Sequence, residues 1–327
     1  MPARRFRWST RAVLGALVLL HSAAGIAQTA PAWPVKPIRF ILPFAPGGPT
    51  ELIARPYAAK LSEALGQAIV IDSRGGGGGI IGTDAVAKAA PDGYTMLMAS
   101  FSFALNQFQF KDLPYDTVRD FAGVSLLAKA PLLLVVNPSL PAKSIKEFIA
   151  LARARPGELN FSSTGPAASG TLAATVFQSM TGVQFTPINY KGQGPGSLAV
   201  ISGEVQFTFF SIPVGVSFVK SGKLRALGVT SAKRSSLMPE VPTIAEGGLP
   251  GYEEVAWYGV LVPVRTPQSV IAKLNSETVR VLQSADIRKT FTALGIEPAP
   301  TTPAEMSEHI SSETAKWSKL LKDLPMN

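Results

Sequence analysis

The chain has 327 residues, of which 46% are hydrophobic and 16% charged, so it is long enough to build more than one packed core. Its 31 basic and 22 acidic residues give a formal net charge of +9, yet no basic run with interleaved aromatics indicates nucleic-acid binding. Cysteine is absent and only two histidines occur, which excludes disulfides, thiol nucleophiles, Ser–His triads and two-histidine metal motifs.

Residues 1–27 have the pattern of a secretory signal peptide. Four arginines, at positions 4, 5, 7 and 11, precede an apolar run at residues 12–20, and Gly25 and Ala27 have the spacing that a signal peptidase cleaves. The apolar run is too short to span a bilayer, although an N-terminal anchor is an alternative interpretation. The pair Arg4-Arg5 also permits twin-arginine export. We therefore expect a periplasmic protein that retains one histidine, His309, on the surface of a C-terminal helix.

The first third of the remaining chain alternates short apolar runs with helical patterns. Such alternation predicts right-handed crossovers in a mostly parallel sheet, that is, an α/β fold. Pro56 interrupts the first helical pattern, which is tolerable as a kink or near a first turn. In chain order the predicted elements are a strand at residues 38–42, a helix at 50–65, a strand at 68–72, a helix ending at 88 and a strand at 94–98.

A second series of the same kind follows a long apolar stretch at residues 122–136. We interpret this stretch and a later one, at 256–262, as segments that cross between two lobes. The prediction is a two-lobed fold, with residues 31–128 and 256–327 in one lobe and 129–255 in the other. Predicted strands of the second lobe are at residues 159–163, 185–189, 207–210 and 226–229, and its helices are at 144–156, at 169–180, after Gly196 and at 214–220.

The tail is predicted to be helical. Thr266-Pro267 opens one helix and Thr302-Pro303-Ala304-Glu305 opens the last, where a capping box and a proline at the first position coincide. A stripe of apolar residues then lies along one face of that last helix and predicts that it packs on a lobe. The stripe consists of Met306, Ile310, Trp317, Leu321 and Leu324.

Three glycine-containing turns between a predicted strand and a predicted helix have the features of an anion site. They are the turns at residues 43–48, 162–165 and 190–194. Glycine lets the backbone approach a ligand closely, and a helix N-terminus offers unpaired N–H groups at the positive end of its dipole. Ligands of open α/β sheets bind outside the carboxyl ends of the strands, so two facing lobes would bring these turns to one cleft. Each turn alone is equally well explained as a tight connection.

Two further motifs are weak. Residues 77–82 satisfy the dinucleotide pattern G-x-G-x-x-G, but the acidic residue that should follow the next strand is missing. Ser217 and Lys220 fit the S-x-x-K spacing of penicillin-recognising enzymes, but the chain lacks that family's other motifs. The residues therefore indicate neither an enzyme nor a cofactor.

The sequence resembles the periplasmic substrate-binding proteins of tripartite tricarboxylate transporters, the TctC or Bug family, from about Trp33 to Trp317. The resemblance lies in an ordered series of motifs: WPVKPI at residues 33–38, PFAPGG at 43–48, PDGYT at 91–95, LPYD at 113–116, YKG at 190–192, SGKLRAL at 221–227, VPTIAE at 241–246 and TP at 266–267.

This resemblance implies a two-domain, type II-like Venus-flytrap fold with a discontinuous first lobe. It further implies a receptor that passes a small organic anion, usually a carboxylate, to membrane transporter subunits, and that works as a monomer without a cofactor. It also implies a ligand set made of the Pro-Gly-Gly turn, the second-lobe turn and their neighbours. Carried over by position, these residues are Phe44, Pro46, Gly47, Gly48, Ser100, Ser102, Ser163, Thr164, Gly165, Ser169, Tyr190, Lys191 and Gly192.

The sequence departs from the family pattern at four places, which affect ligand choice and not the fold. Glu51 stands where an aspartate is common, and Ala167, Ala168 and Thr171 replace the usual serine and histidine of the second-lobe turn. Two other functions remain as alternatives. One is a ligand-sensing module for a membrane kinase, and the other is a secreted hydrolase or lyase on the same scaffold.

Overall fold

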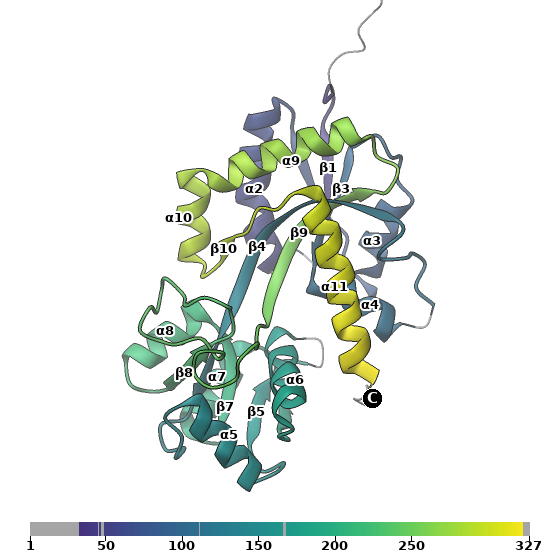
Figure 1. Cartoon of the computed structure of the whole chain (residues 1–327). Helices are drawn as coiled ribbons and strands as arrows, with labels where there is room; N and C mark the ends of the chain where they lie inside the picture. Colours follow the sequence, from purple (N-terminus) through teal and green to yellow (C-terminus); the bar gives the residue numbers. More distant parts are fainter. Residues whose placement is uncertain (1–32, 45, 47–48, 111, 166–167, 323–327) are drawn as a thin grey trace, which may run out of the picture. The chain divides into compact units, whose positions relative to one another are not determined.

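The computed structural model describes residues 33–44, 46, 49–110, 112–165 and 168–322 (Figure 1). The predicted signal peptide, residues 1–27, lies outside this part of the chain, as do Gly47, Gly48 and Ala167. The described strands form one mixed sheet in the order β2–β1–β3–β9–β4–β7–β5–β6, with β8 and β10 also paired to β4. The α/β class is confirmed, and the antiparallel pairs all involve the two crossing strands β4 and β9.

Three parallel strands form one end of the sheet, as the sequence predicts. They are β1 (Ile38–Leu42), β2 (Ile69–Ser73) and β3 (Thr95–Ser100). Helix α2 (Pro49–Leu65) joins β1 to β2, and η1 (Gly77–Gly79) with α3 (Ile80–Ala87) joins β2 to β3. Pro56 lies inside α2, where it removes one backbone donor without ending the helix. Helix α4 (Phe101–Gln109), which follows β3 directly, was not predicted.

A second set of parallel strands forms the other end of the sheet. It consists of β5 (Asn160–Ser163), β6 (Thr186–Asn189) and β7 (Phe207–Ser211), whereas β8 (Arg225–Val229) pairs antiparallel with β4. The helices of this part are α5 (Ile145–Ala154), α6 (Ser169–Thr181), α7 (Gln193–Ser202) and α8 (Ile212–Lys220). Helix α7 begins at Gln193, four residues before the predicted start after Gly196, and Gly192 caps it with a positive φ of 110°.

Strands β4 (Phe121–Val136) and β9 (Val255–Pro263) are the two long apolar stretches that the sequence predicts to cross between lobes. β4 pairs with β9 as far as Pro131 and with β7 and β8 from Leu132 onward. Proline cannot donate to a ladder, and Pro131 lies where the partner strand changes. The next N–H, of Leu132, donates instead to the Thr230 hydroxyl at 2.8 Å.

The C-terminal part consists of α9 (Gln268–Gln283), α10 (Ala285–Ala293), β10 (Glu297–Pro298) and α11 (Pro303–Lys322). The predicted capping box of α11 is present: the Glu305 N–H donates to the Thr302 hydroxyl at 3.2 Å, and the Thr302 N–H donates to the Glu305 carboxylate at 2.8 Å. Met306, Ile310 and Trp317 are buried, as the apolar stripe predicts, while the side chains of Leu321 and Leu324 lie outside the described part of the chain.

Helices α2 and α11 cover opposite faces of the first half of the sheet. Tyr57 of α2 packs edge-on against Phe40 of β1, with ring centroids 5.8 Å apart. Phe40 pairs with Met96 of β3, so these two side chains point to the same face of the sheet. Side chains two residues apart in a strand share a face, so Ser100 points to that face as well, together with its partner Tyr258. Helix α2 therefore covers the face of Ser100 and Tyr258. On the other face, the Trp257 indole donates to Glu313 of α11 at 3.2 Å.

Candidate functional site

The register of the sheet brings the carboxyl ends of the two parallel strand sets toward the same short segment of β4. Ser100, the last residue of β3, pairs with Tyr258 of β9, which pairs with Ala128 of β4. Ser211, the last residue of β7, pairs with Leu132 of β4. β3 and β7 run in opposite directions along β4, so their ends approach each other across four residues, or roughly 13 Å. Loops that follow these strand ends are where open α/β sheets bind ligands.

The turn after β1 leads directly into the first turn of α2. Phe44 is partly buried and Pro46 is exposed, while Ala45, Gly47 and Gly48 lie outside the described residues. The α2 residues Thr50 and Glu51 are buried, with 6% and 7% of their surfaces exposed, and Glu51 forms an ion pair with Arg55. The N-terminus of α2 therefore lies at the edge of the sheet where β1 and β3 end, with its positive dipole end beside the strand ends.

The glycine run after β2 packs closely against the turn after β1. A Cβ at Gly82 would lie 2.8 Å from both the Arg74 carbonyl oxygen and the Pro43 Cα, and one at Gly79 would lie 3.4 Å from the Pro43 carbonyl oxygen. Asn106 of α4 donates to the Gly78 carbonyl at 3.2 Å. These glycines thus allow two turns and a helix to pack together, which explains the run without a dinucleotide.

Ser100 and Ser102 are joined by a hydrogen bond of 3.0 Å between their hydroxyl oxygens. Ser100 is buried and caps α4 in an extended conformation, and Ser102 is partly buried in the first turn of that helix. Both predicted residues therefore lie at the carboxyl end of β3. The Ser100 side chain is on the face of the sheet that α2 covers.

The turn after β5 is held by hydroxyl hydrogen bonds. The Gly165 N–H donates to the Ser163 hydroxyl at 3.0 Å, and the Thr171 hydroxyl donates to the Gly165 carbonyl at 2.8 Å. Ser163 and Thr171 also share a hydrogen bond of 2.9 Å. Gly165 has a φ of +131°, which glycine adopts most readily, and Thr164 at the tip is exposed. Thr171, which departs from the family pattern, here stabilises the turn itself.

This turn and the start of α6 line a small cavity of about 30 Å³. Three predicted ligand residues, Ser163, Thr164 and Ser169, contribute to its wall. Gln193 at the start of α7 and Thr208 on β7 line the same cavity. Gln193 belongs to the predicted turn at residues 190–194 but not to the predicted ligand set, and Thr208 was not predicted at all. All five carry neutral hydrogen-bonding groups. This half of the candidate site therefore offers hydroxyl, amide and backbone N–H donors in place of cationic side chains.

The turn after β6 lies next to that cavity but does not contribute its predicted side chains to the wall. The Tyr190 N–H donates to the Ser163 carbonyl at 2.9 Å, which fixes the two turns side by side. The Tyr190 hydroxyl donates to Glu204 at 2.8 Å, and Lys191 is exposed. Gly192 caps α7. The structure therefore brings Tyr190, Lys191 and Gly192 close to Ser163 through their backbone.

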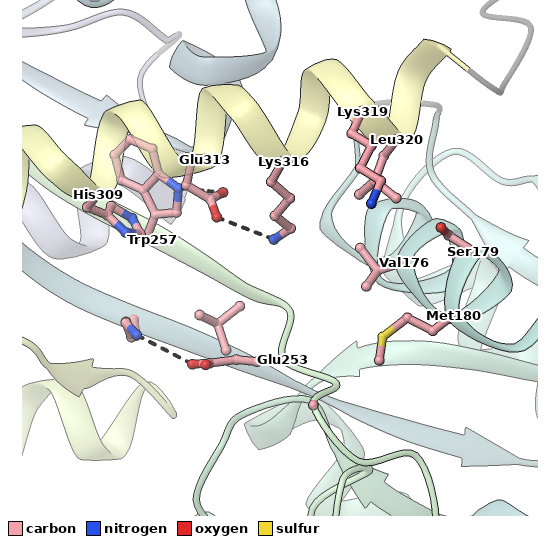
Figure 2. A pocket seen from close by; sticks show the side chains of 13 residues that line it. Val176, Ser179, Met180, Glu253, Trp257, His309, Glu313, Lys316, Lys319 and Leu320 are labelled. Atoms are coloured by element: carbon pink, nitrogen blue, oxygen red, sulfur yellow. Dashed lines mark hydrogen bonds and ion pairs between the residues drawn. The ribbon is translucent and has the colours of Figure 1, made fainter.

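A separate cavity of about 500 Å³ lies between α11, β9 and α6, and none of the predicted ligand residues lines it (Figure 2). Its wall contains an ion cluster in which Lys316 contacts both Glu254 and Glu313. Burial raises the pKa of Glu254 to about 7, although the Lys316 ammonium opposes that shift. Burial acts to lower the pKa of Lys316, but the Glu254 and Glu313 carboxylates raise it by more. Burial weighs less on Lys316 than on Glu254, because the Lys316 side chain is 29% exposed and the Glu254 side chain only 4%.

His309 is partly buried in the wall of that cavity, contrary to the expected surface position (Figure 2). Its ring packs edge-on against Trp257, with centroids 4.9 Å apart, and burial lowers its pKa. The Nε2 atom has no hydrogen-bond partner within the described residues. The sequence expectation failed because His309 follows the buried Met306 by three residues and so lies on the same face of α11 as the apolar stripe.

Two classes of feature are absent from the described part of the chain. No group of three histidine, cysteine or acidic residues there is placed to hold a metal ion. No helix within the same residues is both long and apolar enough to cross a membrane.

A family model described as "Tripartite tricarboxylate transporter family receptor" matches residues 53–326. The chain is 37% identical over 315 residues to protein BugT of Bordetella pertussis, which covers 95% of this chain and 97% of that protein. A structure of an R. palustris protein with adipate is 36% identical, with a TM-score of 0.72, and covers 89% of this chain and 97% of that one. The structure of MatC from Rhodopseudomonas palustris with bound malate is 31% identical, with a TM-score of 0.68, and the match covers 88% of this chain and 100% of that one.

Proposed function

Because the chain belongs to the tripartite tricarboxylate transporter receptor family, we propose that it captures a small organic carboxylate in the periplasm and delivers it to the membrane subunits of such a transporter. We further propose that it is a receptor without catalytic activity, exported by the signal peptide at residues 1–27 and active as a monomer. The two similar structures with adipate and malate support a carboxylate as the ligand class.

The single observation that carries the proposal is the arrangement of strand ends along β4. The ends of β3 and β7 face each other, and hydroxyl-bearing residues lie at strand ends or helix starts on both sides: Ser100 and Ser102 between β3 and α4, Ser163 at the end of β5, and Ser169 at the start of α6. Helix N-termini and hydroxyl donors bind carboxylates without needing a cationic side chain. The ligand would lie between residues 31–128 with 256–327 on one side and 129–255 on the other, and these two lobes would close on it.

We assign the ligand contacts to the three turns that the sequence singles out. The Pro-Gly-Gly turn with Phe44, Pro46, Gly47 and Gly48 would bind one oxyanion through backbone N–H groups. Ser163, Thr164, Gly165 and Ser169 would bind the other end of the ligand. Tyr190, Lys191 and Gly192 would contribute through their backbone, since the Tyr190 hydroxyl is already bonded to Glu204.

Mass spectrometry of ligand released from natively purified protein tests this proposal. We expect denaturation to release an organic acid in about one-to-one amount with protein. The same acid, incubated with fresh protein, should be recovered unchanged. A neutral solute as the sole released ligand would contradict carboxylate capture, and conversion of the acid would contradict the proposal that the chain is not an enzyme.

A further inference from the structure

Tyr258 differs from the other buried tyrosines in its hydrogen bonding. Tyr57 is bonded to Thr278 at 2.8 Å, Tyr252 donates to the Ala173 carbonyl at 3.0 Å, and Tyr115 accepts from Asn106 at 3.3 Å. Tyr258 is only 7% exposed, and its hydroxyl forms no hydrogen bond within the described residues, yet the hydroxyl oxygen is not one of the fully buried side-chain atoms that lack a partner. The ring is therefore buried while the hydroxyl still reaches the protein surface, where it can bind a ligand or ordered water.

The position of Tyr258 points to a ligand as that partner. Tyr258 pairs directly with Ser100 and with Ala128, so the three side chains share one face of the sheet. This is the face that α2 covers. In the chain, α2 follows β1 after the turn at residues 43–48. Tyr258 therefore lies on the same side of the sheet as α2, beside the last residue of β3.

The neighbouring positions on this face are small. Ala256 precedes Tyr258 by two residues in β9 and pairs with Ala130, and Ala128 lies opposite Tyr258. Four residues beyond Ala128, Leu132 pairs with Ser211 at the end of β7. The segment between the two sets of strand ends is thus lined by alanines, with the Tyr258 phenol as its hydrogen-bonding side chain.

We propose that Tyr258 contacts the ligand directly, donating its phenolic hydrogen to an oxygen of the bound organic acid at the base of the site formed by the β3 and β7 ends. The proposal rests on the carboxylate-binding function above. Burial also raises the pKa of Tyr258 to about 12, so the phenol stays protonated and acts as a donor throughout the physiological pH range. A carboxylate oxygen is the acceptor that gains most from such a donor.

Tyr258→Phe removes only the hydroxyl, and Tyr252→Phe is the matched control because Tyr252 is also buried but bonded within the protein. Calorimetric titration with adipate, malate and a panel of other mono- and dicarboxylates would be run on the wild type and both variants. For an acid that binds the wild type, we expect Tyr258→Phe to weaken affinity about ten- to a hundredfold and Tyr252→Phe to leave it unchanged.

Thermal unfolding without ligand should show the opposite order. We expect Tyr252→Phe to lower the melting temperature, because it removes the hydrogen bond that the buried Tyr252 hydroxyl donates to the Ala173 carbonyl, and Tyr258→Phe to leave it unchanged. Unchanged affinity of Tyr258→Phe for an acid that binds the wild type would overturn the role of Tyr258 alone. A wild type that binds no carboxylate of the panel would overturn both this inference and the proposed function.

Discussion

Glu254 is a buried carboxylate that connects the start of β9 to helix α11. Its pKa of about 7 lies above the ordinary value of 4.5, so between these pH values the folded protein holds a proton that the unfolded chain releases. The free energy of unfolding contributed by this group should therefore fall as pH rises from about 4.5 to 7. Because Glu254 is only 4% exposed, the loss should be on the order of 3 kcal/mol.

Comparing the wild type with Glu254→Gln isolates that contribution. Glutamine keeps the shape of the side chain and does not ionise. The free energy of unfolding of the wild type should therefore fall relative to that of the variant as pH rises through this window, and the difference between the two should stay constant at pH values outside it. Urea unfolding at several pH values from about 4 to 8.5 measures the difference. A difference that stays constant, or that grows in favour of the wild type with pH, would mean that the Lys316 ammonium fully compensates burial.

Individual residues of the site were predictable from sequence only where a turn motif marked them. Ser163, Thr164 and Ser169 follow a strand and precede or begin a helix, and the structure places all three on one small cavity. Tyr258 was missed because residues 256–262 form an apolar run that is typical of a buried strand, and only its pairing with Ser100 reveals its face. A tyrosine in an otherwise largely aliphatic crossing strand was the available signal.

At the scale of elements, the glycine run after β2 is a packing device, and two glycine substitutions test this. A Cβ at Gly82 would meet the Arg74 carbonyl oxygen and the Pro43 Cα at 2.8 Å, which are backbone atoms that cannot easily move. Gly82→Ala should therefore lower the free energy of unfolding by about 1–3 kcal/mol. Gly194, in the first turn of α7, differs because a Cβ added there would have no neighbouring atom within 4 Å.

Gly194→Ala is the control for that substitution. Alanine is favoured over glycine in a helix, so this variant should be as stable as the wild type or up to about 1 kcal/mol more stable. Urea midpoints of the two variants give the comparison. Equal stability of Gly82→Ala and Gly194→Ala would show that the turns after β1 and β2 are not closely packed in solution.

Elements were predictable where a local signal determines them and not where tertiary pairing does. The capping box at Thr302 located the start of α11 and shows both expected hydrogen bonds. At the start of α5 the Ser144 hydroxyl likewise accepts from the Glu147 N–H. The two-residue strand β10 exists only because it pairs with β4, and it is too short to show the alternation of apolar and polar residues that would indicate a strand in the sequence. Helix α4 follows β3 directly, so the sequence has no glycine or proline turn signal that would mark where the strand ends and the helix begins.

For the whole molecule, the sequence predicted the order of βα units, and the structure shows how they are joined. The two long apolar runs became β4 and β9, and their antiparallel pairing makes one mixed sheet from two parallel sets. The sequence does not reveal that β4 and β9 pair with each other, nor which strands of the two parallel sets pair with them. The register along β4, which places Ser100 and Ser211 toward a common segment, could therefore come only from the structure.

Calorimetric titration with an organic acid and its neutral amide tests the central claim most directly. The two ligands have the same length and shape, so they differ in the charge that helix N-termini and hydroxyl donors would bind. For adipate, malate or another acid of the panel, we expect saturable binding at one site and at least about a hundredfold weaker binding of the amide. Equal affinity for an acid and its amide, or binding of neutral solutes only, would contradict carboxylate capture.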